Sequence, residues 1–402
     1  MLDKLFGLPK NLRYPLVGLL WIILALLFYS QFMVFWGKAT TPNYVVDVGI
    51  FRDAGIAWLH HAPLYGPDFI SDTMSPFVYP PIAALLFVPL AWLSSTTTQI
   101  IWMLAVYISV WLMLYFANKR LDARHPILFA TMLLPVAAYF MSFRVLQELG
   151  QLDAFLYALV MADILGFIPR KFRGIGVGIA AALKMTPAVW GLFFLFRKDW
   201  ASVIRSAVTF LATVVIGFII YPSQSTYFWS KLAFDSTRAT SPHYERDQSI
   251  RAMLTRSFFT YDQMDMVKPF LFLFGFGLAA VCAWFFIRKG NEVLAYFTLF
   301  LGLMLFQPVA NYHHWIGAVV ALSIFFVYKG THSWAARISG VLVSIGLILA
   351  WLTVYIFHID FTYWLARPVA LNWLMWNIVD FTAIIAFIIL VPLAFKAEKT
   401  NV

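Results

Sequence analysis

Long apolar runs, separated by short polar segments, recur along the whole chain. They cover residues 15–36, 80–96, 98–117, 125–141, 151–168, 174–196, 201–221, 268–287, 292–308, 313–328, 338–357 and 376–395. A helix of about 20 apolar residues crosses a hydrocarbon core about 30 Å thick. Helices also satisfy their own backbone hydrogen bonds within lipid. The pattern predicts an all-α polytopic membrane protein, with about 10 to 13 transmembrane helices in a single domain over residues 1–402.

Two of the apolar stretches do not fit a simple alternation of crossings. If every basic break between runs faces the cytoplasm, residues 80–117 and 174–196 must each make one membrane crossing more or fewer than their length indicates. Proline removes a backbone donor and clashes with the preceding turn. We therefore expect broken or re-entrant helices there, with the breaks at Pro80-Pro81 and at Pro187, beside a cavity near the outer leaflet.

Two longer polar stretches are predicted to be outer loops that carry interfacial helices. Residues 37–79 hold four aspartates and follow the first apolar run, which is where an enzyme would place its chemistry. Residues 222–267 carry balanced charges and are expected to form short helices. The first loop is the predicted catalytic loop, and the second is predicted to cover the cavity.

Composition and charge support this topology. Hydrophobic residues make up 62% of the 402 residues and charged residues only 12%, which excludes a soluble globule. The net charge of +10 comes from Lys and Arg at the short breaks between runs. By the positive-inside rule, these breaks and the N-terminus face the cytoplasm. The charge is thus a topological signal and does not indicate a nucleic-acid partner.

Asp47 is the first candidate for catalysis. Apolar residues after it, such as Val48 and Phe51, predict an interfacial amphipathic helix with Asp47 at its start. The carboxylate fits an N-cap, which accepts a backbone hydrogen bond. It fits equally well a general base that takes a proton from an attacking hydroxyl at the mouth of a cavity. Asp53 falls on another helix face and is the weaker candidate.

Three cationic or imidazole positions are candidates for binding a phosphate. Lys184 lies too deep in its apolar run to reach either flanking basic break, and intramembrane lysines usually face a partner or a water-filled path. His313 and His314 fit the outer end of a span, where imidazole donates to a phosphate oxygen. Adjacent side chains on a helix diverge by about 100° and would not chelate one metal together. A zinc site is therefore disfavoured. No metal is expected at the site, and no cofactor is expected.

Further polar residues gather in the predicted outer regions. Glu148 and Gln151, three positions apart, would share one helix face at the entrance of a span. Arg251 follows a D-Q-S turn in the second outer loop, where a solvated loop face is the default interpretation. The chain has no P-loop and no glycine-rich nucleotide fingerprint. Its substrate is therefore not expected to arrive as a cytosolic nucleotide.

Taken together, these short pieces resemble glycosyltransferase family 87, in which GT-C type enzymes take a sugar from a polyprenyl phosphate. They run in the family's order and comprise D-x-x-x-F-R-D-A (47–54), L-Y (64–65), Y-P-P (79–81), G-Q-L-D (150–153), A-L-K-M-T-P (182–187), D-Q-S-I (247–250) and Q-P-x-x-x-Y-H-H (307–314). The chain differs from the usual pattern at Asp153, at Met185-Thr186 and at Gln307. The order of the pieces carries more weight than any single one.

The resemblance implies Asp47 as the catalytic base, in a site at the outer leaflet of the plasma membrane. It implies an inverting transfer of mannose from polyprenyl-phosphate mannose to a glycolipid acceptor of the phosphatidylinositol mannoside type. Lys184, His313, His314 and Arg251 would bind the donor phosphate. The residues expected to bind substrate are Tyr65, Tyr79, Glu148, Gln151 and Gln248.

Two alternatives stay open at the level of sequence. An arabinofuranosyltransferase that uses polyprenyl-phosphate arabinose fits the same motifs. A lipid or sugar transporter also places charges within helices, although transporters commonly carry two related halves and a midplane site. No internal repeat is evident in this sequence, and its charges gather toward the outer end of the spans. The pattern therefore favours the enzyme.

Overall fold

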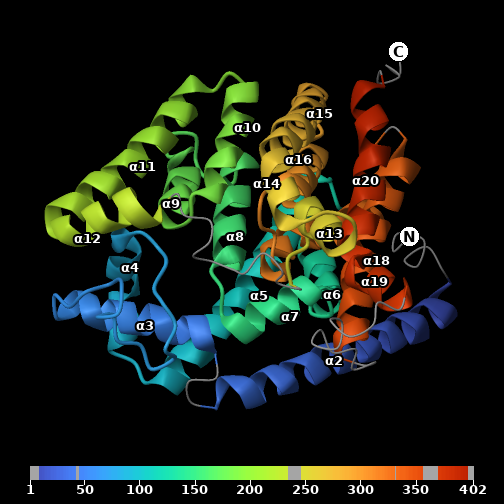
Figure 1. Cartoon of the computed structure of the whole chain (residues 1–402). Helices are drawn as coiled ribbons and strands as arrows, with labels where there is room; N and C mark the ends of the chain where they lie inside the picture. The colour runs from blue at the N-terminus through green and yellow to red at the C-terminus, as the bar shows by residue number, and fades with distance from the viewer. Residues whose placement is uncertain (1–8, 42–44, 234–245, 331, 356–369, 397–402) are drawn as a thin grey trace. The chain divides into compact units, whose positions relative to one another are not determined.

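The computed structural model describes residues 9–41, 45–233, 246–330, 332–355 and 370–396, and nearly all of these lie in helices or in short turns between helices (Figure 1). The chain divides into two compact units. Unit 1 comprises residues 1–33, 110–145 and 242–402, and unit 2 comprises residues 34–109 and 146–241. Each unit is described by itself. The predicted outer loop 222–267 is only partly described, because residues 234–245 lie outside these ranges.

Three helices begin in one unit's segment of the chain and end in the other's. They are α2 (Lys10–Ala39), α5 (Ser95–Arg120) and α7 (Met141–Leu149). Unit 2 otherwise contains α3 (Val46–Leu59), α4 (Pro81–Ala91), α8 (Asp153–Ile164), α9 (Ile175–Leu183), the 3-10 helix η1 (Thr186–Trp190), α10 (Gly191–Phe196), α11 (Trp200–Ile220), α12 (Pro222–Tyr227) and the π-helix η2 (Phe228–Leu232).

Unit 1 is built around one helix that is apolar on every face. Thirteen successive residues of α16 (Glu292–Phe306), Val293 to Leu305, are buried, as expected of a helix surrounded by others. The remaining elements are α6 (Pro126–Ala137), α13 (Ile250–Ser257), α14 (Tyr261–Leu271), the π-helix η4 (Phe272–Phe276), α15 (Gly277–Arg288), the 3-10 helix η5 (Tyr312–Val319), α17 (Val320–Val327), α18 (Ser333–Tyr355), α19 (Ala370–Trp376) and α20 (Ile378–Phe395).

Six helices in the described ranges are long and apolar enough to cross a membrane. They span Tyr14–Ala39, Ser95–Arg120, Trp200–Ile220, Asp262–Arg288, Ser333–Tyr355 and Ile378–Phe395. A seventh candidate consists of α6 and α7, which meet at a bend of 77°. On α11, Ile204, Val208 and Ile219 are each more than half exposed, which suits contact with lipid. The chain is a multi-pass, helical membrane protein, as the sequence predicts, whereas the count of ten to thirteen spans stays a prediction.

The two predicted helix breaks have different outcomes. In residues 174–196, α9 ends at Leu183, Lys184 has extended backbone, and Pro187 lies in η1, so a break is present there. In residues 80–117 the predicted position is wrong, because Pro81 begins α4 and the break falls later, between Ala91 and Ser95. Proline is tolerated in the first helical turn, where the missing N–H has no intrahelical partner.

Candidate active site

Asp47 lies in the first turn of α3, so the helix that the sequence predicts after this residue is present. The residue at the N-cap position is Val45, so the interpretation of Asp47 as an N-cap is wrong. A carboxylate in the first turn is nevertheless favoured by the helix dipole. Val48 and Phe51 are fully buried and fix the helix in unit 2, while Asp47 itself is only partly buried. Asp47 is therefore held in a largely apolar surrounding without being fully enclosed.

A tight turn between α7 and α8 places Gln151 beside Asp47. Gly150 has a φ of +77°, a left-handed conformation that favours glycine. A β-carbon at this position would lie 2.3 Å from Val48 Cγ2 and 2.6 Å from Val45 Cγ1 on the chain at the start of α3. Because α7 ends at Leu149, Glu148 and Gln151 do not share a helix face, and that expectation was wrong.

A chain of hydrogen bonds joins four of the predicted residues. Gln151 Nε2 donates to Asp47 Oδ2 at 2.5 Å, and Tyr79 Oη donates to Gln151 Oε1 at 2.9 Å. Tyr65 Oη in turn donates to the Tyr79 carbonyl oxygen at 2.7 Å. These hydrogen bonds therefore link four of the short sequence motifs within unit 2. The motifs are those that contain Asp47, Leu64-Tyr65, Tyr79-Pro80-Pro81 and Gly150-Gln151.

The surroundings of Asp47 suit proton transfer near neutral pH. Burial raises the pKa of Asp47 to about 7, although the hydrogen bond from Gln151 and the positive charge of Lys184 act to lower it. The nearby negative charge of Asp153 raises the same pKa. A general base works best when its pKa lies near the operating pH. Asp47 therefore meets the electrostatic requirement for such a base.

Lys184 forms an ion pair with Asp153. Its Nζ atom lies 2.9 Å from Asp153 Oδ1 and 3.1 Å from Oδ2, and Asp153 is only 4% exposed. The extended backbone of Lys184 ends α9, and Asp153 begins α8. A deep lysine was expected to face either a partner or a water-filled path, and the structure shows a partner. Any phosphate that binds Lys184 would do so beside this carboxylate.

Two other acids singled out in the sequence, Asp53 and Glu148, have structural partners. Asp53 Oδ2 accepts hydrogen bonds from the Ser71 hydroxyl and the Asp72 backbone N–H, which ties the loop after α3 to that helix. Glu148 forms an ion pair with Lys38 at 2.8 Å. Asp53 is thus explained by the fold of the loop, and Glu148 stays a predicted substrate-binding residue.

In unit 1, the two other motifs are paired with each other. Asp247 and Asn311 form an isolated antiparallel bridge, in which Gln248 N donates to the Ala310 carbonyl oxygen at 2.9 Å. Asp247 Oδ1 also accepts from the Ala310 backbone N–H at 2.8 Å. Gln248 is fully buried. The D-Q-S-I piece is thereby fixed to the residues that lead into His313 and His314.

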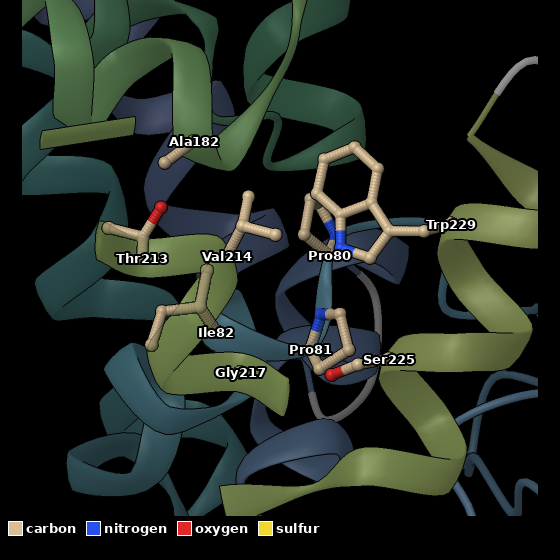
Figure 2. Close-up of a pocket in the computed structure, with 9 residues that line it drawn as sticks. All are labelled: Pro80, Pro81, Ile82, Ala182, Thr213, Val214, Gly217, Ser225 and Trp229. Carbon is tan, nitrogen blue, oxygen red and sulfur yellow. The ribbon is translucent and has the colours of Figure 1, made fainter. Parts of the chain in front are cut away.

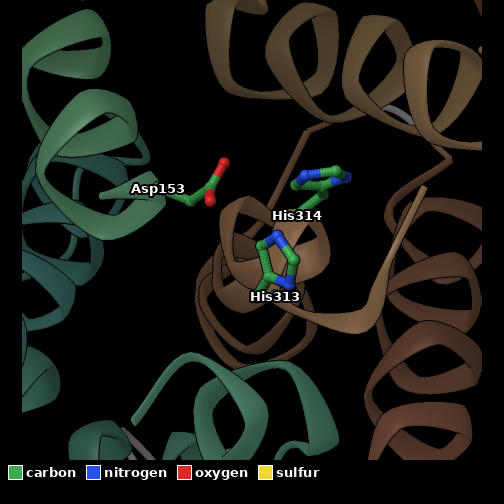
Figure 3. Close-up of side chains that lie close together, drawn as sticks. All are labelled: Asp153, His313 and His314. Carbon is green, nitrogen blue, oxygen red and sulfur yellow. The ribbon is translucent and has the colours of Figure 1, made fainter. Parts of the chain in front are cut away.

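His313 and His314 lie in the 3-10 helix η5 that follows this bridge (Figure 3). His313 is buried and His314 is partly exposed. The ring centroids are 4.2 Å apart with an interplanar angle of 72°, so the expected divergence of the two rings was wrong. The expectation of no metal rested partly on that divergence and stays a prediction. The two imidazoles form one compact group within unit 1.

The side chains of two arginines of α13 are buried, which corrects the default interpretation of this segment as a solvated loop face. Arg251 is 7% exposed and forms an ion pair with Asp265 at 2.8 Å. Arg256 donates to Asn377 Oδ1 at 2.7 Å and lies 3.4 Å from Asp380 Oδ2 in α20. Sequence reasoning missed Asp380, although a single acid within a long apolar run was a signal for a buried polar partner.

Two hollows in unit 2 are not sized or lined for a sugar. Figure 2 shows the first, at the start of α4, whose volume of about 10 Å³ leaves room for little more than one water molecule. It is lined by Pro80, Pro81, Ile82, Ala182, Thr213, Val214, Gly217, Ser225 and Trp229. The second, about 560 Å³ between α9, η1, α10 and α11, has Ser206 as its one polar lining side chain. Sugar sites need several polar groups.

The family model that describes glycosyltransferase family 87 matches residues 77–310. The chain belongs to glycosyltransferase family 87. The matched residues include Tyr79, Gln151, Lys184 and Arg251, whereas Asp47 precedes them and the histidine pair follows them. The resemblance inferred from the short motifs is therefore confirmed, and a family 87 protein is a membrane glycosyltransferase.

This family 87 chain is similar to curated mannosyltransferases from mycobacteria. It is 29% identical over 332 residues to the polyprenol-phosphate-mannose-dependent α-(1-2)-phosphatidylinositol mannoside mannosyltransferase of Mycolicibacterium smegmatis, a match that covers 74% of each chain. The protein of that name in Mycobacterium tuberculosis is 28% identical over 78% of this chain and 79% of its own. Among solved structures, ArnT from Cupriavidus metallidurans in the apo state matches with a TM-score of 0.42 and 12% identity, over 91% of this chain and 76% of that one.

Proposed function

We propose that the protein transfers mannose from polyprenyl-phosphate mannose to a lipid-linked glycan acceptor of the phosphatidylinositol mannoside type. The names of the similar mycobacterial enzymes support this donor and this acceptor class. The observation that carries the proposal is the partly buried Asp47, which is fixed by Gln151 and whose pKa is raised to about 7. A carboxylate with that pKa is suited to general-base catalysis at a hydroxyl group.

The proposed step is an inverting displacement at the anomeric carbon. Asp47 takes the proton from an acceptor sugar hydroxyl, whose oxygen forms the new bond to the anomeric carbon of mannose. The bond between that carbon and the phosphate oxygen breaks, and its electron pair leaves with the polyprenyl phosphate. Negative charge grows on the phosphate oxygens, so preorganised cations and imidazoles there lower the barrier.

The phosphate-binding roles predicted from the sequence are assigned as follows. Lys184 and the pair His313 and His314 are proposed to bind the leaving phosphate. Arg251 is the weakest of the four candidates, because its side chain is more deeply buried than that of Lys184 and its guanidinium is paired with Asp265. Glu148 and Gln248 are proposed to bind substrate. No metal enters the step, since a monophosphate carries less charge than a nucleotide diphosphate.

The site is proposed to lie at the outer face of the plasma membrane. The Lys and Arg residues that follow or separate the spans support a cytoplasmic position for the opposite face. A lipid-linked donor reaches such a site within the bilayer. The use of a lipid-linked donor also explains why the chain needs no nucleotide-binding motif.

A transfer assay tests the proposal. Purified protein in liposomes is given radiolabelled polyprenyl-phosphate mannose and phosphatidylinositol mannosides, and the labelled glycolipid is quantified. Wild type should form product in the presence of EDTA, whereas Asp47→Asn should lose at least about 100-fold in rate, the lower range for a general base. An active Asp47→Asn variant would remove the base from the mechanism. If the protein transfers arabinose from polyprenyl-phosphate arabinose but no mannose from the mannose donor, the proposed donor sugar is wrong and arabinofuranose takes its place.

A further inference from the structure

The amide of Gln151 lies between the carboxylate of Asp47 and the hydroxyl of Tyr79. Nε2 contacts Asp47 Oδ2 at 2.5 Å, and Oε1 accepts from Tyr79 Oη at 2.9 Å. We infer that Gln151 is a positioning residue, which holds one oxygen of the Asp47 carboxylate so that the other oxygen meets the acceptor hydroxyl, with Tyr79 fixing the amide. This inference rests on the proposed function, in which Asp47 is the base.

Tyr79 determines which end of the amide faces Asp47. A glutamine amide presents two N–H donors on one side and a carbonyl acceptor on the other. The phenol hydroxyl donates to the carbonyl oxygen, so the N–H side points at the carboxylate. With the amide reversed, a carbonyl oxygen would face a carboxylate oxygen, and the two would repel. Tyr65 anchors Tyr79 in turn, through the bond from its hydroxyl to the Tyr79 carbonyl.

The hydrogen bond from Gln151 also favours the ionised form of Asp47, against the larger effect of burial. Burial acts against the carboxylate form, as does the charge of Asp153 from α8. The Gln151 N–H and the ammonium of Lys184 at the end of α9 favour it. A donor that bonds to the charged form lowers a carboxyl pKa, so removing that donor must raise the pKa of Asp47.

The positioning role differs from the sequence-based expectation that Gln151 and Tyr79 bind substrate. Both ends of the Gln151 amide are engaged within unit 2, as is the Tyr79 hydroxyl. A sugar could bind either side chain only by displacing one of these hydrogen bonds. The two roles predict different kinetics, because a lost substrate ligand raises KM, whereas a mispositioned base lowers kcat.

The test is the pH dependence of transfer by Gln151→Met, in which a side chain of similar length lacks the amide. A hydrogen bond to a charged group is worth about 10- to 100-fold in an equilibrium. We expect kcat at pH 7 to fall by about that factor, and the acid limb of the rate profile to move up by about one to two pH units. Activity should recover in part at pH 9, and KM for both substrates should stay the same. Gln263→Met, an exposed glutamine in the capping box of α14, is the matched control.

Tyr79→Phe is a second variant that keeps the ring and its packing against Phe51. It should move the acid limb in the same direction by a smaller amount, because the amide keeps its N–H groups but loses its fixed orientation. Tyr115→Phe, whose ring stacks on Trp111 in α5, is the control. Thermal melting in detergent separates a folding defect from a change in kcat.

The outcomes separate this inference from the proposed function. If Gln151→Met and Tyr79→Phe raise KM at constant kcat, or leave the acid limb in place, the positioning role is wrong while Asp47 remains the base. If Asp47→Asn keeps full activity, the proposed function fails first. A folded Gln151→Met protein with an upshifted acid limb, together with an inactive Asp47→Asn, supports the positioning role.

Discussion

Lys184 Nζ lies within hydrogen-bonding distance of both carboxylate oxygens of Asp153, at 2.9 and 3.1 Å. Removing one partner of a buried ion pair leaves an uncompensated charge and costs about 3–5 kcal/mol. We expect Lys184→Met to lower the thermal midpoint and to raise KM for the donor. Asp153→Asn should instead keep activity, because it leaves the lysine free to bind the phosphate.

The double variant Asp153→Asn/Lys184→Met decides between two roles for this lysine. If Lys184 binds donor phosphate, the double variant regains stability but not donor affinity, as measured by melting and by KM. If the ion pair is purely structural, stability and donor affinity should both return in the double variant, because neither charge is then left buried alone. Recovery of full activity in the double variant would therefore exclude Lys184 from phosphate binding.

The rate of transfer should depend on pH through Asp47. The carboxyl must be ionised to accept a proton, and burial raises its pKa to about 7. We therefore expect kcat/KM to rise tenfold per pH unit below about 7 and to level off above it. The measurement is the initial transfer rate from pH 5 to 9. A plateau that extends down to pH 5 would show that no group with this pKa limits the reaction.

The sequence pattern predicted those features of the site that depend only on residues close together in the chain. The apolar positions after Asp47 predicted α3, and the depth of Lys184 in an apolar run predicted that it faces either a partner or a water-filled path. The first follows from the amphipathic spacing of apolar residues, and the second from the cost of leaving a charge unpaired in lipid. The partners themselves were not predictable, since Asp153 lies 31 positions from Lys184 and Gln151 lies 104 positions from Asp47.

The turn at Gly150 shows why a spacing rule failed at the same place. An interval of three positions puts two side chains on one helix face only if the helix continues between them. The left-handed backbone at Gly150 ends α7 and redirects Gln151 toward α3. Glycine was the signal in the sequence, but the close approach of Val45 and Val48 that requires it belongs to the tertiary packing.

Gly150→Ala should reduce activity and stability together. The β-carbon would lie 2.3 Å from Val48 Cγ2, and the left-handed φ is unfavourable for alanine. Strain of this kind costs about 1–3 kcal/mol. The displaced turn would also weaken the bond from Gln151 to Asp47. Melting temperature and transfer rate measure the two effects.

Gly37→Ala is the matched control for this substitution. Gly37 lies within α2, and a β-carbon there would meet no other atom within 4 Å. Alanine is the better helix former, so its melting temperature should be unchanged or slightly higher. If Gly150→Ala behaves like this control, the turn is not required for the site.

Replacing the proposed base should stabilise the protein in a pH-dependent way. The folded pKa of Asp47, about 7, lies above its ordinary value of 3.8. Between these values the folded state binds more protons than the unfolded state, so the stability contributed by this group falls as pH rises through that window. Asp47→Asn removes the ionisation. Its melting temperature should exceed that of wild type at pH 8, and the difference should shrink at pH 5. A difference that is independent of pH would contradict the raised pKa.

Arg256 connects α13 and the residues before it to α20, the last long helix of unit 1. Its guanidinium donates to the Asp247 carbonyl oxygen at 2.7 Å, bonds Asn377, and lies 3.4 Å from the fully buried Asp380. Arg256→Met should destabilise the protein by about 3–5 kcal/mol, because Asp380 then keeps a buried charge without its partner. Adding Asp380→Asn should restore much of that loss, whereas the exposed Arg288→Met should have little effect.

Because Asp247 also pairs with Asn311, just before His313, Arg256→Met should weaken donor binding more than acceptor binding. Equal changes in both KM values would argue that the bridge supports the fold alone.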